Sequence, residues 1–186
     1  MVDRVKTDLL NYKTPHFKPG KNFIIRGIWY FVNVIFFINP INPFVKSKVI
    51  LLRIFGAKVG KGLVIKPSVN IKYPWKLSIG NHVWIGEKVW IDNLDQVVIG
   101  DNCCISQDAL LISGNHNYKK SGFDLIIGPI VLEDGVWIGA KSIVTLSTKC
   151  LSHSVLSAGS LLSSDMEAYT IYRGNPAIKI KERIIE

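Results

Sequence analysis

Aliphatic residues recur at every sixth position over much of this chain, and that spacing is the main clue to its fold. Six is neither the period of a helix nor the two-residue alternation of a strand, so neither element alone places these residues on one side. A coil of three short strands does so, with one aliphatic residue of each hexapeptide pointing inward. The pattern therefore predicts a three-sided column of stacked strands. The inward positions are Val59, Ile65 and Ile71; Ile79, Ile85 and Ile91; Ile99, Ile105 and Leu111; and Leu132, Ile138, Val144, Cys150, Leu156 and Leu162.

Breaks in this register show where the column is interrupted. Two-residue slips occur at 71–79 and at 91–99, each after a third face, so insertions enter at one corner. The largest break lies between Leu111 and Leu132 and begins with the polar, glycine-rich string SGNHNYKKSGFD. It predicts an external loop near residues 113–130. We divide the chain into a basic, apolar N-terminal segment with short helices (1–58), the repeat domain (59–168) and a C-terminal tail with a GNPA turn (169–186).

The residue before each inward aliphatic residue should face away from the core, yet at eight such positions on two faces it is apolar. A solvated monomer rarely exposes so much contiguous apolar surface. We expect these faces to be buried between subunits, and a threefold-symmetric trimer is the natural closed assembly. The positions are Trp84, Trp90, Cys104, Leu110, Trp137, Ile143, Val155 and Leu161.

Residues 23–44 (FIIRGIWYFVNVIFFINPINPF) form the segment most easily mistaken for a membrane span. Arg26, Pro40 and Pro43 interrupt it, and its apolar run is too short to cross about 30 Å of hydrocarbon. Two interpretations remain: a short helix packed on the protein, or a basic, aromatic helix lying in a membrane interface. The N-terminus lacks the pattern of a secretory signal.

The net charge of +9 is placed unevenly along the chain. Residues 1–58 hold ten Lys or Arg against two Asp, whereas residues 59–186 hold thirteen against twelve acidic residues. The scattered basic residues form no nucleic-acid-binding module, so we expect no nucleic-acid partner. Cys103, Cys104 and Cys150 have neither metal-ligand spacing nor an even count, which favours a reducing, cytoplasmic setting.

Several strings in the repeat region resemble the hexapeptide-repeat O-acetyltransferases, and most closely the colanic acid biosynthesis acetyltransferase type. They are IGNHVWIGEKVWIDNL, VVIGDNCCISQDALLISGNHNY, GPIVLEDGVWIGAKSIV and YTIYRGNPAIKIK, and the resemblance covers about residues 50–183. It implies an all-β, left-handed parallel β-helix with a short α-helical N-terminal segment. It also implies an enzyme that transfers acetyl from acetyl-CoA to a sugar hydroxyl in exopolysaccharide or other surface-polysaccharide biosynthesis. The cofactor would lie between neighbouring subunits of a homotrimer, with no metal.

The same resemblance assigns roles to individual residues. His116 matches the catalytic histidine, expected to act as general base on the acceptor hydroxyl. Asp92 and Asn93 match a polar pair on the acceptor side, although Asp92 could equally serve the turn alone. Ser163 and Ser164 replace a Thr-Lys pair frequent in relatives, so a cationic contact is missing there. Lys181 matches a position that contacts the cofactor, although it could also be an ordinary solvated lysine. The implied cofactor contacts are Trp137, Ala140, Ala158, Ser163, Ser164 and Lys181.

One departure from the family pattern and two competing functions remain open. Leu151 stands where glycine is commonest, which puts the local turn geometry in doubt. A zinc-dependent carbonic anhydrase on the same fold needs three histidines; His82 and His116 are suggestive, but neither His153 nor His16 has a plausible spacing. The other alternative is a non-catalytic scaffold or membrane-docking protein. In the enzyme reading, the acceptor is a sugar or a lipid-linked sugar, and the N-terminal segment brings the cytoplasmic enzyme to the inner membrane face.

Overall fold

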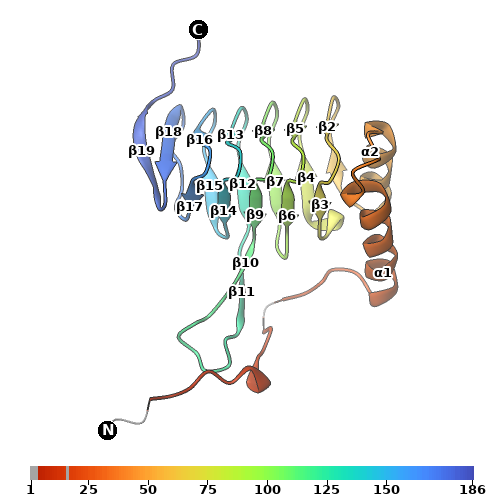
Figure 1. The fold of residues 1–186 in the computed structure, drawn as a ribbon, viewed down its shortest axis with the longest axis vertical. Coiled ribbons are helices and arrows are strands. Elements are labelled where there is room, and N and C mark those ends of the chain that lie inside the picture. Colours follow the sequence, from red (N-terminus) through yellow and green to blue (C-terminus); the bar gives the residue numbers. More distant parts are fainter. Residues whose placement is uncertain (1–3, 16) are drawn as a thin grey trace.

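The structure, a computed structural model, describes residues 4–15 and 17–186. Short parallel strands wind into a column with three flat sides, capped by helices at one end and by a hairpin at the other (Figure 1). The predicted stacking of coils is therefore confirmed. The first sheet contains β1 (Lys58–Val59), β4 (Leu77–Ile79), β7 (Val97–Ile99), β12 (Ile130–Leu132) and β15 (Thr148–Cys150).

The other two sides repeat the same arrangement one hexapeptide further along each coil. The second sheet holds β2 (Val64–Ile65), β5 (Trp84–Ile85), β8 (Cys104–Ile105), β13 (Trp137–Ile138), β16 (Val155–Leu156), β18 (Thr170–Gly174) and β19 (Ala177–Glu182). The third sheet holds β3 (Asn70–Ile71), β6 (Trp90–Asp92), β9 (Leu110–Ile112), β14 (Ile143–Thr145) and β17 (Leu161–Leu162).

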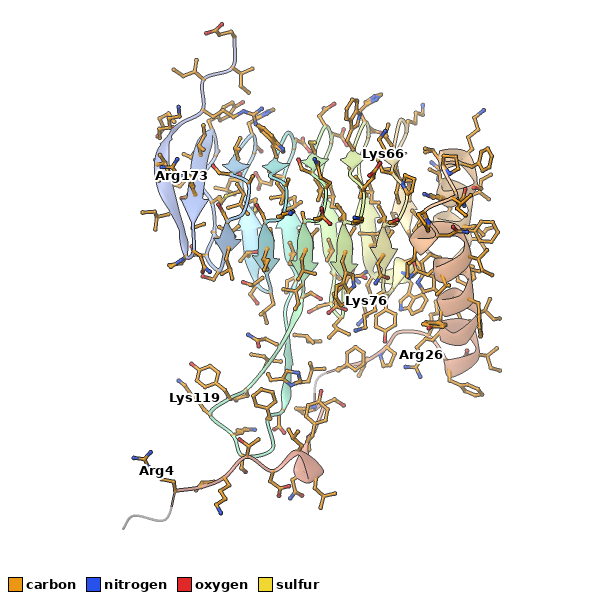
Figure 2. All side chains as sticks on the ribbon, in the orientation of Figure 1. Arg4, Arg26, Lys66, Lys76, Lys119 and Arg173 are labelled. Carbon is orange, nitrogen blue, oxygen red and sulfur yellow. The ribbon has the colours of Figure 1, made fainter. Side chains whose placement is uncertain are left out.

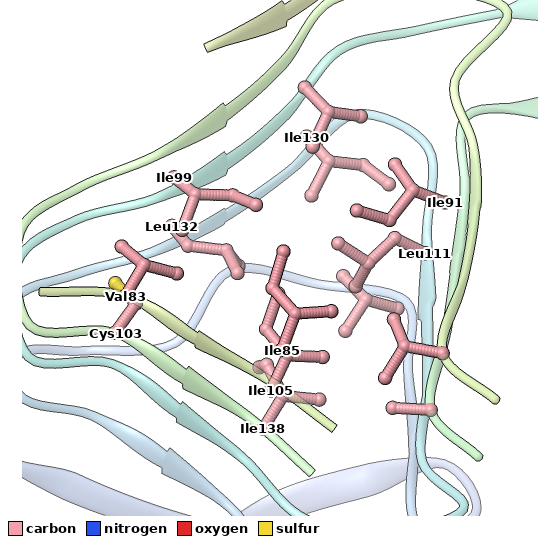
Figure 3. Packing of buried hydrophobic residues seen from close by; sticks show 14 of the residues in the cluster. Val83, Ile85, Ile91, Ile99, Cys103, Ile105, Leu111, Ile130, Leu132 and Ile138 are labelled. Carbon is pink, nitrogen blue, oxygen red and sulfur yellow. The ribbon is translucent and has the colours of Figure 1, made fainter. Parts of the chain in front are cut away.

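The interior is filled by the aliphatic residues that the six-residue period identified. Apart from Val59, which is half-buried at the first strand, every predicted inward residue is buried, and Figure 3 shows several of them stacked in layers. The residue two positions earlier in each hexapeptide is buried as well, as at Val83, Cys103 and Val136. Each face thus contributes two inward side chains, because residues i and i+2 of a strand lie on the same side.

Each tight turn places the third residue after the inward aliphatic residue in the left-handed region. His82 (φ 56°) and His153 (φ 60°) occupy this position in different coils. The turn that contains Leu151 therefore keeps the common geometry although it lacks the usual glycine, and Cys150 stays fully buried. The doubt about this turn is resolved, since the conformation depends on His153 rather than on Leu151.

All insertions leave the column at the corner between the third and first sheets, as the register slips predicted. The largest is an arm built from β10 (Gly114–His116) and β11 (Leu125–Ile127), an antiparallel pair that projects from the column (Figure 1). The N-terminal segment here called the strap comprises residues 8–15 and 17; it runs beside this arm and includes the short 3-10 helix η1 (Leu9–Asn11). Lys13 anchors the strap, because its carbonyl accepts the Leu125 N–H at 3.0 Å and its N–H bonds Asp124 Oδ1 at 3.2 Å.

Helices α1 (Phe23–Val32) and α2 (Val45–Ile54), with the π-helical turn η2 (Asn33–Ile38), cover the first coil of the column. Trp29 and Phe37 are buried there, and the Trp29 indole donates to the Ile71 carbonyl at 2.9 Å. One side of this segment therefore packs on the protein, as the first of the two interpretations held. The buried Lys48 ammonium donates to the Lys66 carbonyl, and desolvation lowers the pKa of this lysine. None of the helices described in residues 4–15 and 17–186 has the length and apolarity needed to cross a membrane.

The outward apolar positions are mostly open in the single chain, as predicted. Trp84, Trp90 and Trp137 are 61%, 44% and 47% exposed, while Cys104, Leu110, Ile143 and Leu161 are half-buried. Val155 differs: it is buried in the ladder between Trp137 and Ile171. Cys103, Cys104 and Cys150 are free.

Candidate active site

A cavity of about 460 Å³ lies where the arm, the strap and the column meet. It brings His116 of the arm together with Asp92 of the column, which lie far apart in the sequence but were both expected at an acceptor site. Its walls combine aromatic rings with a few polar groups, the usual make-up of a small-molecule site. The lining residues are Tyr12, Thr14, Phe17, Lys72, Tyr73, Asp92, Leu94, Ile112, Gly114, Asn115, His116 and Leu125.

His116 is held in one orientation by the arm itself. Its Nδ1 atom lies 3.0 Å from the carbonyl oxygen of Phe123, and its ring stacks on the Phe123 ring with centroids 4.5 Å apart and planes 8° apart. A carbonyl oxygen only accepts hydrogen bonds, so in the neutral imidazole Nδ1 carries the proton. Nε2 is then left with its lone pair, which is the form that a general base requires.

The strap completes the wall beside this histidine. The Tyr12 ring lies against the His116 ring with centroids 5.7 Å apart, and Phe17 stacks on Tyr73 at 6.3 Å. Lys76 joins strap and column, because its ammonium donates to the Lys18 and Leu94 carbonyls and lies 5.2 Å from the Phe17 ring centroid. Burial lowers the pKa of Lys76, opposed by the Asp95 carboxylate.

Asp92 lies at the end of β6, with its carboxylate largely shielded from solvent. The Lys72 ammonium is 2.9 Å from Asp92 Oδ1, without the alignment of a hydrogen bond. Lys72 follows Ile71 as Asp92 follows Ile91, and Ile71 pairs with Ile91 in the ladder. The register of the repeat could therefore have revealed this ion pair, which the sequence reasoning missed.

The Asn93 amide is bound to the backbone of Tyr73. Its side chain is fully buried, its Oδ1 accepts the Tyr73 N–H at 2.9 Å, and its Nδ2 donates to the Tyr73 carbonyl. Both ends of the amide are thus occupied by backbone. Asn93 holds Tyr73 in place, and Tyr73 rather than Asn93 lines the cavity.

The residues expected to contact the cofactor lie elsewhere on the chain. Ala140 and Ala158 are stacked at the corner between the second and third sheets, where the Gly159 N–H donates to the Ala140 carbonyl at 2.8 Å. Adjacent coils approach so closely here that a Cβ on Gly139 would lie 2.5 Å from the Ala158 nitrogen. Trp137 stands on the second sheet, with its indole donating to Ser106 Oγ at 2.9 Å.

Three further expected contacts are scattered in the single chain. Ser163 and Ser164 are exposed just after β17, at the corner from which the arm leaves two coils earlier in the stack. Lys181 is exposed in β19, opposite Ile171. One chain therefore unites His116 with Asp92, but it places Ala140 and Ala158 at a different corner.

The zinc alternative depends on histidines that the fold separates. His82 lies in a turn of the column, His116 in the arm and His153 in a later turn; His16 falls outside the described residues. Within residues 4–15 and 17–186, no three His, Cys, Asp or Glu side chains gather as metal ligands would.

Comparison with known proteins decides the family. The chain is 34% identical, over 95% of its own length and 97% of the relative, to the provisionally assigned colanic acid biosynthesis acetyltransferase WcaF of Escherichia coli K12. The chain belongs to the hexapeptide-repeat acetyltransferases. The predicted resemblance is confirmed, and it extends into the N-terminal segment that the motifs left out. No family model matches the chain.

More distant hexapeptide-repeat acetyltransferases agree with this assignment. Galactoside O-acetyltransferase of Escherichia coli K12 is 27% identical over 74% of this chain and 70% of its own. A Vibrio cholerae hexapeptide-repeat acetyltransferase, solved with acetyl-CoA, superposes with a TM-score of 0.78 at 21% identity, covering 91% of this chain and 94% of that one. A galactoside acetyltransferase solved with coenzyme A gives 0.76 at 22% identity, covering 86% and 80%. These structures confirm the left-handed β-helix.

Proposed function

We propose that this acetyltransferase moves an acetyl group from acetyl-CoA to a hydroxyl of a sugar during the assembly of a surface polysaccharide. The observation that carries the proposal is the His116 imidazole, whose Nδ1 faces the Phe123 carbonyl while the ring lines a cavity shared with Asp92. The relatives named for colanic acid biosynthesis and for galactoside acetylation support a carbohydrate acceptor.

In the proposed reaction His116 first takes a proton from the acceptor hydroxyl and then gives it to the sulfur of the leaving thiol. Nε2 accepts the proton of the acceptor hydroxyl as its oxygen bonds to the thioester carbonyl carbon. The imidazolium then returns this proton to the sulfur as the carbon–sulfur bond breaks, so an acetyl ester and free thiol are formed. The Phe123 carbonyl stabilises the imidazolium, because Nδ1–H points at it throughout.

The cavity offers an acceptor two kinds of contact. Tyr12, Phe17 and Tyr73 present ring faces against which the C–H face of a sugar packs. Asp92 accepts hydrogen bonds from sugar hydroxyls and is oriented by Lys72. These groups hold the hydroxyl that reacts close to Nε2.

We further propose that the active site is completed by a second chain in a homotrimer. The exposed tryptophans of the second and third sheets supply apolar surface for such packing. Ala140 and Ala158 lie at another corner than the arm, so the arm of one chain can meet that corner of its neighbour. The cofactor contacts with Trp137, Ala140, Ala158, Ser163, Ser164 and Lys181 belong to this proposal, as does a cytoplasmic location at the inner membrane face.

Thiol release from acetyl-CoA, measured with a panel of nucleotide-linked and lipid-linked sugars, tests the function directly. We expect release that depends on one class of sugar, together with a product heavier by one acetyl group in mass spectrometry. If no sugar in the panel stimulates release from protein that binds acetyl-CoA, the carbohydrate acceptor is ruled out.

A further inference from the structure

The helical cap of the column is apolar on both of its sides. Its inner side packs on the first coil, yet Ile24, Ile28, Phe31 and Ile35 form an exposed stripe at helical spacing on the outer side. Their exposed fractions range from 51% to 65%. A helix that is hydrophobic all round is normally buried on every side, so we infer that this exposed outer stripe binds a partner.

The stripe continues into the connection between the helices and forms one larger surface. Ile41 is 85% exposed and Phe44 is 70% exposed, and together with the stripe they make up what we call the outer cap face. Between η2 and the start of α2 this face contains an open hollow of about 350 Å³, lined by Ile35, Phe36, Ile41 and Phe44 among others. Such a hollow has room for part of an acyl chain.

The outer cap face stays open when the sides of the column are packed. Asn33 donates to Asn70 Oδ1 at 2.8 Å and Trp29 to the Ile71 carbonyl, so the helices lie across the end of the column. Figure 2 shows side chains projecting from these helices away from the coils. A contact between lateral sheets, as in the proposed trimer, leaves the end surface uncovered and turns the caps of all its chains the same way.

Charge identifies the chemistry of the partner. Residues 9–86, which contain the cap, the first coil and all of the strap except Asp8, hold twelve Lys or Arg and not one Asp or Glu. Lys21 lies just before α1 and Lys46 at the start of α2; both are exposed, and both are within three residues of Ile24 or Phe44 in the sequence. Apolar side chains rimmed by cations fit a surface that is apolar below and anionic at its rim, which is the interface of an acidic lipid bilayer.

We propose that the outer cap face docks on the surface of a membrane containing anionic phospholipid, with the column standing on its helical end. This docking rests on the proposed location at the inner membrane face, names the surface that makes the contact, and does not require acyl transfer. Docking by this face would also place the cavity near the membrane. Its residues Lys72 and Tyr73 follow the first coil and Asp92 ends a strand of the second, and coils are about 5 Å apart, so the cavity lies close to the cap. A sugar attached to a membrane lipid through its head group is within reach of this cavity.

The test is co-sedimentation of the full-length protein with phosphatidylcholine vesicles prepared with and without phosphatidylglycerol. We expect binding only when phosphatidylglycerol is present, weakened by high salt. The double variant Ile28→Glu/Phe31→Glu should lower the partition coefficient at least about tenfold, because two apolar contacts are replaced by carboxylates that the anionic surface repels. A matched control is Ile184→Glu/Ile185→Glu, which alters two exposed residues in the C-terminal tail and should change binding less than about twofold.

Two further measurements separate this inference from its competitors. Thiol release with a water-soluble sugar acceptor should be unchanged in Ile28→Glu/Phe31→Glu. If the parent protein releases no thiol but still binds the vesicles, the proposed acyl transfer fails and the docking proposal stands. Light scattering without vesicles shows whether a second copy covers the cap. Absence of binding to the phosphatidylglycerol vesicles, equal binding of both double variants, or a particle mass that halves in Ile28→Glu/Phe31→Glu would overturn the proposal.

Discussion

The Nδ1 atom of His116 lies 3.0 Å from the carbonyl oxygen of Phe123, and the rings of the two residues are stacked. This pairing is made within the arm by two residues that flank its turn, with the Asn117 N–H bonded to the Asp124 carbonyl at 2.7 Å. The arm thus presents the imidazole as a preformed unit, and the strap supports it through Tyr12. A proton-accepting Nε2 follows from this geometry.

Replacing His116 with Ala should lower kcat for acetyl transfer by about 10²–10⁴-fold, because the hydroxyl loses its general base. The measurement is thiol release under saturating acetyl-CoA and acceptor. His82→Asn is the matched control, since His82 lies in a turn of the column where Asn tolerates the positive φ. A rate for His116→Ala close to that of the control would show that another group removes the proton.

Removing the aromatic ring of Tyr12 should weaken acceptor binding. We expect Tyr12→Ala to raise KM for the sugar roughly tenfold and to affect KM for acetyl-CoA less, because this ring lines the cavity proposed to hold the acceptor. Leu10→Ala, a change at a 94% exposed residue of the same strap, serves as the control. Equal KM values for sugar in the two variants would contradict a strap contribution to the site.

The ion pair between Lys72 and Asp92 should show up as coupling in a double-mutant cycle. Asp92→Asn and Lys72→Met are each expected to raise KM for the acceptor, whereas the double variant should lose less than the sum of the two effects. Because Lys72 is partly exposed, we expect a coupling free energy of only about 1 kcal/mol. Strict additivity would mean that Lys72 does not orient the carboxylate.

The buried thiols should resist modification in the folded protein. Burial raises the pKa of Cys103 to about 11 and raises the pKa of Cys150 as well, so little thiolate exists at pH 8. In a Cys104→Ser variant, a thiol-reactive dye should therefore label neither residue until denaturant is added, when two equivalents react. A raised pKa also means that the unfolded chain releases these protons first, so the free energy of unfolding should fall as the pH rises above about 9.

The apolar sides of the column should hold the proposed trimer together. Trp84 is 61% exposed in the single chain, so Trp84→Glu should leave the coil folded but convert trimers to monomers. Light scattering after size-exclusion chromatography gives the mass. Ile178→Glu changes a similarly exposed residue on β19 and should keep the parental mass. A monomeric parent protein, or an unaltered mass for Trp84→Glu, would contradict the lateral packing.

The sequence alone determined the coil, its register and the corner at which insertions leave it. Residues such as Ile138, Val144 and Cys150 recur every six positions because each turns its side chain into the same core, so local order carries the information. The candidate base and the family were likewise readable, since motifs around His116 are contiguous. In the same way, the break after Leu111 predicted an external loop, although not the antiparallel strands β10 and β11 that form the arm.

Only the tertiary structure decided how the cavity is assembled. Asn93 turns inward to bind the Tyr73 backbone, Phe123 fixes the tautomer of His116, and the strap brings Tyr12 beside that ring. These contacts join segments with no common period, and they depend on where the arm and the strap cross. Such crossings arise from the path of the whole chain, which a repeat of six residues does not encode.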